Sequence, residues 1–185
     1  MRERLRALSP AFMTEASRRI AAHILHHLEG NVRLNAGCHV ALFGGLKNEP
    51  DLVSHLLPEL DAVGAGACFF HIEQHFLQPR QVHAPDDLQR GHMNVWEPRD
   101  HCPALDITAL DVVLVPGLAF TRDGVRLGRG GGYYDRLLAH PTFRAQCVAV
   151  AFDCQIIDQI PAESHDQRVH QLITESGLID ASSSH

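Results

Sequence analysis

The sequence predicts an α/β protein with three layers: a mostly parallel β-sheet with helices on both faces. Short continuous apolar runs alternate with helical patterns along the chain. Such runs are typical of parallel strands that are buried on both faces. No internal repeat and no linker of distinct composition divides the 185 residues. We therefore expect a single domain over residues 1–185.

Three patterns predict the helices. Ser9 can cap a helix that begins at Pro10. Apolar residues then recur near a helical period at positions 12, 16, 20, 24 and 28, and Gly30 ends the pattern. Residues 49–64 predict a second helix, which Pro58 should kink or break. Residues 133–140 are typical of the start of a third helix.

Four apolar runs predict buried strands, namely 38–45, 66–72, 111–117 and 147–153. Residues 169–177 predict a short edge strand, and the polar tail after them is expected to fray. The stretch from 73 to 103 is polar and irregular, apart from an edge strand expected at 94–98. Ligands bind beyond the carboxyl ends of strands in such sheets, so the loops after Phe43 and Val115 are the places to look.

Composition and charge exclude several classes of protein. Hydrophobic residues make up 45% and charged residues 21%, which is ordinary for a folded soluble chain. Sixteen basic and 22 acidic residues give a net charge of −6, which argues against binding to nucleic acid or to a membrane surface. No apolar run approaches the ~20 residues that span a bilayer, and the basic N-terminus lacks the apolar core of a secretory signal. We expect a cytoplasmic monomer.

Cysteine and histidine give weak signals. The five cysteines are odd in number and show no C-x-x-C spacing, so buried, inert thiols are expected rather than disulfides or a zinc ribbon. His23, His26 and His27 could share part of one helix face with a spacing that can bind a metal. No carboxylate stands at ligand spacing beside them, so solvated or partly buried imidazoles are favoured.

The segment 115–136 carries the clearest chemistry. Its glycines leave backbone N–H groups free to approach an anion, and a helix is expected to follow them; they are Gly128, Gly130, Gly131 and Gly132. Four arginines stand against two aspartates, a local charge of +4 − 2 = +2; the arginines are Arg122, Arg126, Arg129 and Arg136. A concentrated positive loop on an acidic protein indicates a small polyanion such as a nucleoside triphosphate.

Other interpretations of this loop stay open. A Walker A loop fails because Tyr133 and Tyr134 follow the glycines, and the dinucleotide pattern lacks its third glycine. A flexible glycine-rich turn with solvated arginines is the alternative. Asp135 could hold Mg²⁺ on the phosphates or stabilise the first helical turn. The two tyrosines could pack on a flat heterocycle or into the core.

Four segments together resemble one family. The run PGLAFTRDGVRLGRGGGYYDR resembles the signature of the 5-formyltetrahydrofolate cyclo-ligases, also called methenyltetrahydrofolate synthetases. FGGLKNEPDL at 43–52 is similar to that family's strand-loop-helix, NVWEP at 94–98 to its segment that ends in Glu-Pro, and IPAESHDQRVHQLITESG to its C-terminal segment. The resemblance covers nearly the whole chain.

The resemblance implies a fold of the sugar-phosphate isomerase and CoA-transferase type. It also implies ATP- and Mg²⁺-dependent conversion of 5-formyltetrahydrofolate to 5,10-methenyltetrahydrofolate with release of ADP and phosphate. The implied ATP contacts are Arg126, Leu127, Gly128, Arg129, Gly130, Gly131, Gly132, Tyr133 and Tyr134. The implied folate contacts are Glu49, Arg129, Gly130, Gly131, Gly132 and Tyr133, the implied catalytic residues are Arg129, Gly130 and Tyr133, and the implied metal ligands are Asp135 and Asp166.

Two alternatives accompany this expectation. The family opens with a basic Lys-x-x-Leu-Arg segment that contacts ATP, whereas RLRALS here begins almost at Met1, and residues 73–93 lack the family's usual folate-pocket features. A catalytically impaired relative that binds folate or nucleotide is therefore the first alternative. A sugar-phosphate isomerase that uses Glu49 or Asp166 as base is the second, and it would not need ATP.

Overall fold

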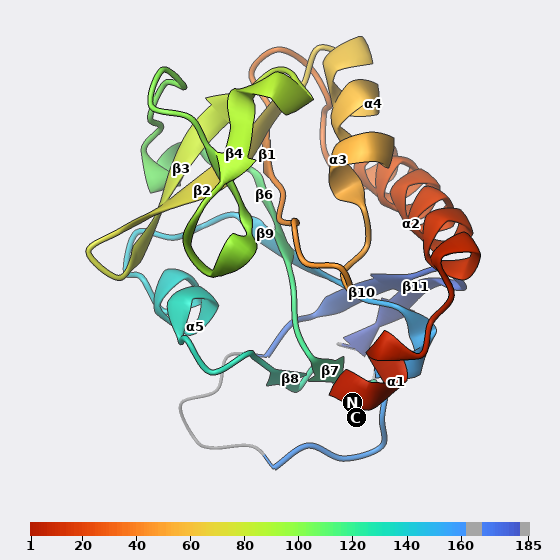
Figure 1. The fold of residues 1–185 in the computed structure, drawn as a ribbon. Helices are drawn as coiled ribbons and strands as arrows, with labels where there is room; N and C mark the ends of the chain where they lie inside the picture. Colours follow the sequence, from red (N-terminus) through yellow and green to blue (C-terminus); the bar gives the residue numbers. More distant parts are fainter. Residues whose placement is uncertain (162–167, 182–185) are drawn as a thin grey trace.

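A seven-stranded sheet forms the centre of the molecule in this computed structural model, which describes residues 1–161 and 168–181. The strand order is β11-β10-β9-β6-β1-β2-β3 (Figure 1). The strands of this sheet are β1 (His39–Ala41), β2 (Gly66–Glu73), β3 (Phe76–Val82), β6 (Val112–Val115), β9 (Gln146–Val150), β10 (Gln171–Thr174) and β11 (Gly177–Asp180).

The interior of this sheet is parallel and its two edges are antiparallel. β1 pairs in parallel with β2 and β6, and β9 pairs in parallel with β6 and β10. β3 joins β2, and β11 joins β10, in antiparallel hairpins. The expectation of a mostly parallel α/β sheet is confirmed.

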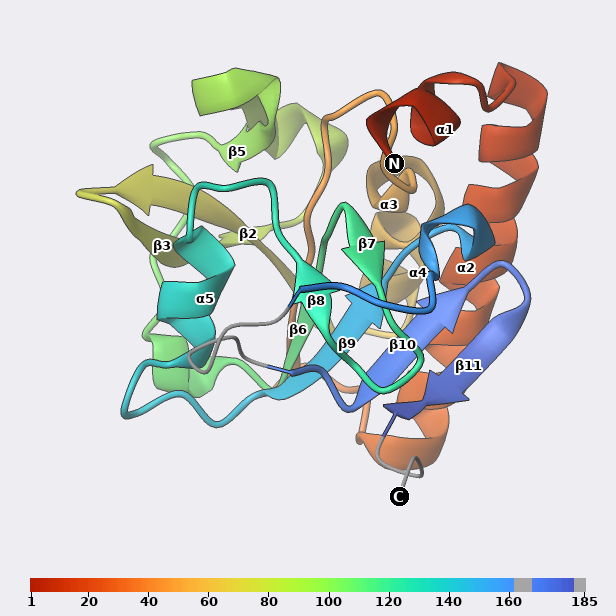
Figure 2. The ribbon, with the colours of Figure 1, turned by 90° about the horizontal axis from the view of Figure 1, so that it is seen from below.

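Helices lie on both faces of the sheet. Figures 1 and 2 show α2, α3 and α4 together on one face and α5 on the other, beside β3. The α-helices are α1 (Arg2–Arg6), α2 (Pro10–Asn31), α3 (Leu52–His55), α4 (Leu57–Ala62) and α5 (Tyr133–Leu138). No helix within the described residues is long and apolar enough to cross a membrane.

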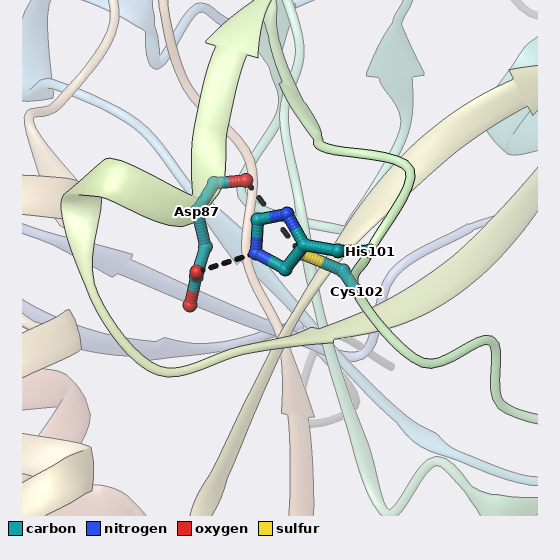
Figure 3. A group of neighbouring side chains, drawn as sticks. All are labelled: Asp87, His101 and Cys102. Atoms are coloured by element: carbon teal, nitrogen blue, oxygen red, sulfur yellow. Dashed lines mark hydrogen bonds and ion pairs between the residues drawn. The ribbon is translucent and has the colours of Figure 1, made fainter.

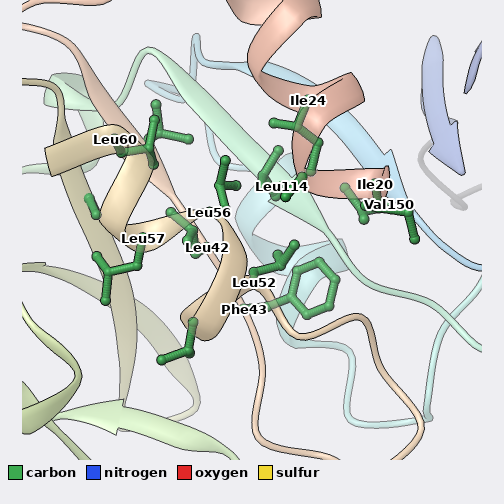
Figure 4. Close-up of a cluster of buried hydrophobic side chains, with 14 of the residues drawn as sticks. Ile20, Ile24, Leu42, Phe43, Leu52, Leu56, Leu57, Leu60, Leu114 and Val150 are labelled. Atoms are coloured by element: carbon green, nitrogen blue, oxygen red, sulfur yellow. The ribbon is translucent and has the colours of Figure 1, made fainter. Parts of the chain in front are cut away.

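Alternating side chains along the strands supply two cores. In β6, Val112 and Leu114 pack in the core under α2, α3 and α4, whereas Val113 and Val115 pack in the core on the α5 side. Figure 4 shows the first core, where Ile20 and Ile24 of α2 lie beside Leu114 and leucines of α3 and α4 fill the other side. Burial on both faces explains why β6 is apolar at every position.

The longest helix follows its sequence pattern closely. Ser9 Oγ accepts a hydrogen bond from the Phe12 backbone N–H at 3.2 Å, and Pro10 is the first residue of α2. The buried stripe includes Ala16, Ile20, Ile24 and Leu28, as the period predicts. Phe12, however, stays 42% exposed and lies outside that core.

The single helix expected at 49–64 is wrong. Asp51 caps α3 by accepting from the Ser54 backbone N–H at 3.0 Å, so Glu49 stays in the preceding loop. A new helix, α4, then begins at Leu57, with Pro58 in its first turn where a missing N–H costs little. A break was expected at Pro58; it lies two residues earlier, at Leu56, and divides the segment into two short helices.

The irregular stretch expected at 73–103 is also wrong. It contains β3 and a separate two-stranded sheet made of β4 (Leu88–Arg90) and β5 (Trp96–Pro98). β3 tolerates Pro79 because it is an edge strand. The strand expected at 94–98 is real, but it belongs to this small sheet.

Other boundaries also differ from expectation. The strand expected at 38–45 is regular only over β1, and the edge strand expected at 169–177 is β10, which is internal because β11 pairs outside it. Sequence patterns did not predict α1, nor the two-residue strands β7 (Ala119–Phe120) and β8 (Arg126–Leu127). Short 3₁₀ turns complete the described chain at Pro85–Asp87, His92–Asn94, Ile107–Ala109 and Asp153–Gln155.

The cysteines are unpaired thiols. Cys38, Cys68 and Cys102 are buried, and Cys147 and Cys154 are half-buried. Burial raises the pKa of Cys38 to about 11 and the pKa of Cys68 to about 12. These thiols are protonated at neutral pH, which agrees with the expected inert role.

Candidate active site

A cavity of about 320 Å³ opens beyond the carboxyl ends of β1 and β6. These two strands are parallel neighbours in the centre of the sheet. Phe43 and Gly44 follow β1 and line the cavity, and Pro116 follows β6 and lines it as well. The cavity lies at the place indicated by the strand order, after Phe43 and Val115.

The lining combines an apolar surface with charged groups. Aromatic and aliphatic side chains come from several elements, among them Phe43, Phe70, Ile72, Leu77, Trp96 and Tyr134. Five charged residues join them: Arg2, Glu49, Arg126, Arg129 and Asp135. A cavity of this kind can enclose a flat heterocycle and place an anionic group beside it.

Glu49 meets Arg129 at this cavity. Nη2 of Arg129 lies 3.0 Å from Oε1 of Glu49, and Nε of Arg129 donates to the same oxygen at 3.2 Å. The Glu49 side chain is only 7% exposed. Burial raises the pKa of the Glu49 carboxyl, and the Arg129 guanidinium opposes that rise.

Arg126 is the buried cation of the site. Its side chain is 5% exposed, and it forms an ion pair with Asp135. Nη1 donates to the Pro116 carbonyl oxygen at 3.2 Å, so Arg126 also fixes the loop after β6. Its buried Nε has no hydrogen-bond partner within the described part of the chain. An unpartnered guanidinium N–H beside the cavity fits an anionic ligand.

Both tyrosines line the cavity, and Tyr134 also packs against the core. Tyr134 meets Phe70 edge-to-face, with ring centroids 6.0 Å apart, and the Arg126 guanidinium lies 5.9 Å from its ring centroid. Burial raises the pKa of the Tyr134 phenol, and the Glu49 carboxylate adds to this rise. The Arg136 guanidinium lies 5.0 Å from the Tyr133 ring centroid. Tyr134 therefore packs in the core and also lines the cavity.

The glycine loop turns sharply into α5. Gly132 is the N-cap residue with φ of +64°, a left-handed conformation that favours glycine. The Arg136 side chain holds this turn by donating to the Gly131 carbonyl oxygen at 3.1 Å. Because α5 has only six residues, its dipole adds little charge to the site, and the arginines supply most of it.

Most of the expected site residues lie together at the cavity: Glu49, Arg126, Gly128, Arg129, Gly131, Gly132, Tyr133, Tyr134 and Asp135. Leu127 and Gly130 do not line it; Leu127 follows Arg126 in β8 and is 42% exposed. Arg122 lines a separate surface depression, so it does not add to the charge of the cavity. Asp166 lies outside the described residues.

Sequence reasoning missed one wall of the cavity. Met93, Val95 and Trp96 line it from the loop and strand after β4, and Arg2 lines it from α1. The signal for this wall was present, since Trp96 is the one tryptophan in the sequence. A neighbouring buried carboxylate, Glu97, lies 2.9 Å from Nδ1 of His71.

Two further groups of side chains could in principle ligate a metal, but hydrogen bonds within the protein account for their positions. Figure 3 shows Asp87, His101 and Cys102, the one such cluster in residues 1–161 and 168–181. Asp87 accepts from His101 at 2.9 Å and from the backbone of the turn before it, while the Cys102 thiol donates to the Asp87 carbonyl oxygen. His27 is buried and hydrogen-bonds Gln171 at 3.1 Å. A metal site on the helix with His27 is not supported.

The fold and the cavity define an α/β protein with an apolar recess that lies next to an arginine- and glycine-rich loop. The 5-formyltetrahydrofolate cyclo-ligase family model matches residues 1–175. The chain therefore belongs to the 5-formyltetrahydrofolate cyclo-ligase family. The expectation of a cyclo-ligase enzyme, made from the glycine loop and its companion segments, is confirmed at this level.

Individual relatives agree. The chain is 28% identical over 186 residues to the 5-formyltetrahydrofolate cyclo-ligase of Escherichia coli. This alignment covers 95% of this chain and 97% of that protein. It is 49% identical over 78 residues to the Mycolicibacterium smegmatis cyclo-ligase, covering 42% of this chain and 40% of that protein. The structure of Aquifex aeolicus 5,10-methenyltetrahydrofolate synthetase matches with a TM-score of 0.78 and 28% identity, over 99% of this chain and 90% of that one.

Proposed function

We propose that this cavity catalyses ATP- and Mg²⁺-dependent cyclisation of 5-formyltetrahydrofolate to 5,10-methenyltetrahydrofolate, with release of ADP and phosphate. The contact between Arg129 and Glu49 carries the proposal. The contact joins the glycine loop to a buried carboxylate in an apolar recess. The loop suits phosphates, and the carboxylate suits the ring donors of a reduced pteridine. Family membership supports the same reaction.

The chemistry needs the two substrates side by side. The N5-formyl group is an amide and a poor electrophile. Its oxygen attacks the γ-phosphorus of ATP and ADP leaves, which turns that oxygen into a leaving group. N10 then attacks the formyl carbon, loses its proton, and expels phosphate as the ring closes. Positioning and charge stabilisation supply most of the catalysis in such a phosphoryl transfer.

The proposed roles follow the geometry. Glu49 would accept hydrogen bonds from the pteridine. Arg129, which extends from the glycine loop to Glu49, would face both substrates. Arg126, whose side chain lines the cavity, would attract the triphosphate by its positive charge. Tyr133 would cover the reacting ring, and the backbone of 128–132 would approach the phosphates.

Asp135 fits a magnesium ligand. Its side chain is 39% exposed and stands at the cavity, with Oδ1 paired to Arg126. Magnesium in phosphoryl-transfer sites uses one or two carboxylates together with substrate phosphates. Bound Mg²⁺ would neutralise charge on those phosphates, with Asp135 and Asp166 as the proposed ligands.

One observation favours the active enzyme over an impaired relative. Arg2, in the basic first helix α1, lines the cavity. A basic side chain from this segment is therefore present at the site. The isomerase alternative has no support from the family assignment. The expected cytoplasmic location and monomeric state stay predictions.

The direct test is turnover. Purified protein with 5-formyltetrahydrofolate, ATP and Mg²⁺ should develop the near-ultraviolet absorbance of the methenyl product, with one ADP formed for each product. Omission of ATP should abolish the signal. Folate binding without turnover would support the impaired relative, and turnover independent of ATP would contradict the proposal.

A further inference from the structure

The cavity wall formed by Met93, Val95 and Trp96 depends on one arginine that does not line the cavity itself. Arg90 ends β4 and stands directly opposite Trp96 of β5 in the small sheet. Its guanidinium carbon lies 3.7 Å from the centroid of the Trp96 ring system. The indole therefore has a cation packed against it, while the Trp96 side chain also lines the cavity.

Arg90 also joins two loops of the site. Its Nη1 donates to the Asn94 carbonyl oxygen at 2.9 Å and to the Gly45 carbonyl oxygen at 2.5 Å. Asn94 belongs to the loop that carries Met93 and Val95 to the cavity. Gly45 belongs to the loop that leads from β1 to Glu49. One guanidinium thus holds the tryptophan wall against the loop of the buried carboxylate.

The backbone between these loops is close and strained. Met93 and Asn94 both have positive φ, +55° and +63°, which is unusual for residues other than glycine. A Cβ at Gly45 would lie 2.5 Å from the Trp96 backbone nitrogen, so the two chains touch. The Trp96 N–H donates to the Gly44 carbonyl oxygen at 3.0 Å. Arg90 adds two side-chain hydrogen bonds to this backbone bond between the strained turn and the opposite loop.

We propose that Arg90 is a positioning residue that fixes the tryptophan wall of the folate recess against the Glu49 loop. The inference rests on the proposed function, because it takes the recess to be the reduced-folate site. It predicts that Arg90 affects the binding of the folate and leaves the phosphoryl transfer itself almost unchanged. The proposed triphosphate contacts come mainly from the glycine loop, whereas the contacts of Arg90 are with Gly45, Asn94 and Trp96.

Arg90→Met tests this with a matched control. Methionine keeps an apolar stem over the indole and removes both hydrogen bonds and the charge. The KM for 5-formyltetrahydrofolate should rise about tenfold, which corresponds to the loss of one charge-assisted interaction. The kcat and the KM for ATP should stay within about twofold. Arg90→Lys should recover part of the loss, because lysine keeps the charge without the planar fork.

Arg99→Met is the control on the same small sheet. Arg99 follows β5 and its Nε donates to the Asp86 carbonyl oxygen at 2.8 Å, away from the cavity lining. This variant should keep all three kinetic constants. Equal losses in Arg99→Met and Arg90→Met would mean that the small sheet merely needs its arginines for stability, and would overturn the proposal. An unchanged folate KM in Arg90→Met would overturn it as well.

Trp96 gives a readout that does not need turnover, since it is the one tryptophan in the chain. Acrylamide should quench its fluorescence more strongly in Arg90→Met than in the wild type, because the wall loosens. Titration with 5-formyltetrahydrofolate should show a midpoint shifted by the same factor as the KM. Unchanged quenching and an unchanged midpoint overturn the role of Arg90. A shifted midpoint in a protein without turnover keeps that role and overturns the proposed function alone.

Discussion

Arg129 and Glu49 are in direct contact although 80 residues separate them in the sequence. The contact brings the glycine loop to the loop before α3 and closes one side of the cavity. Both partners lie in segments without regular structure: Glu49 in the loop between β1 and α3, and Arg129 between β8 and α5. The pair is the point at which the proposed phosphate and pteridine sites meet.

Glu49→Gln should lower kcat/KM for the folate by about 100-fold, because a neutral amide loses charge-assisted hydrogen bonds to the ligand and to Arg129. The KM for ATP should change much less. Steady-state kinetics with each substrate varied in turn measures both. Glu29→Gln, an exposed change in α2, is the matched control and should retain full activity. A Glu49→Gln enzyme within threefold of the wild type would contradict the role of this carboxylate.

The pH profile should reveal the same carboxylate. Burial raises the pKa of Glu49 above 4.5, its ordinary value, so protonation begins at a higher pH than in an exposed glutamate. The anion is the form that accepts hydrogen bonds, and therefore kcat/KM for the folate should fall as the pH drops through this raised pKa. The acid limb should vanish in Glu49→Gln. An inflection that persists in the variant belongs to another group.

Arg126→Met should impair the use of ATP most. Removal of this buried cation takes away the N–H that lacks a protein partner and leaves Asp135 without its ion pair. The KM for ATP should rise by about tenfold or more, with a smaller effect on the folate. Because Asp135 is partly exposed and can be hydrated, the free energy of unfolding should fall by only about 1–2 kcal/mol, measured in urea. A larger effect on folate than on ATP would contradict the assignment.

Gly132→Ala should reduce activity through the backbone. Gly132 has φ of +64°, and alanine there costs about 1–2 kcal/mol or shifts the loop. Gly30→Ala is the matched control, because a Cβ at Gly30 in α2 meets nothing within 4 Å. That change should leave activity intact and should raise the melting temperature slightly. Equal kinetics for both variants would show that the turn into α5 does not matter for function.

The sequence predicted those helices and strands in which a regular pattern of apolar residues marks the buried faces. Strands β6 and β9 are continuous apolar runs because both of their faces are covered, and the α2 stripe follows from one buried helix face. The loop of the proposed phosphate site was recognisable because its glycines and arginines stand together in the chain. Local patterns therefore predicted the central strands of the sheet and the arginine- and glycine-rich side of the cavity.

The parts of the fold and of the candidate site that the sequence did not predict depend on contacts between distant segments. β3 carries polar residues and Pro79 because it is an edge strand, so no apolar pattern marks it. Arg90 gains its role only when β4 and β5 pair and place it over Trp96. The ion pair of Glu49 and Arg129 needs β1 and β6 to be neighbours. Such relationships follow from topology, which spacing along one chain does not show.

The fate of the formyl oxygen tests the central claim most directly. 5-Formyltetrahydrofolate labelled with ¹⁸O in its formyl group would be converted with unlabelled ATP in unlabelled water, and the released phosphate analysed by mass spectrometry. The account predicts one ¹⁸O atom in each phosphate, because the cavity joins that oxygen to the γ-phosphorus before N10 closes the ring. Unlabelled phosphate, with the label lost to water, would contradict it.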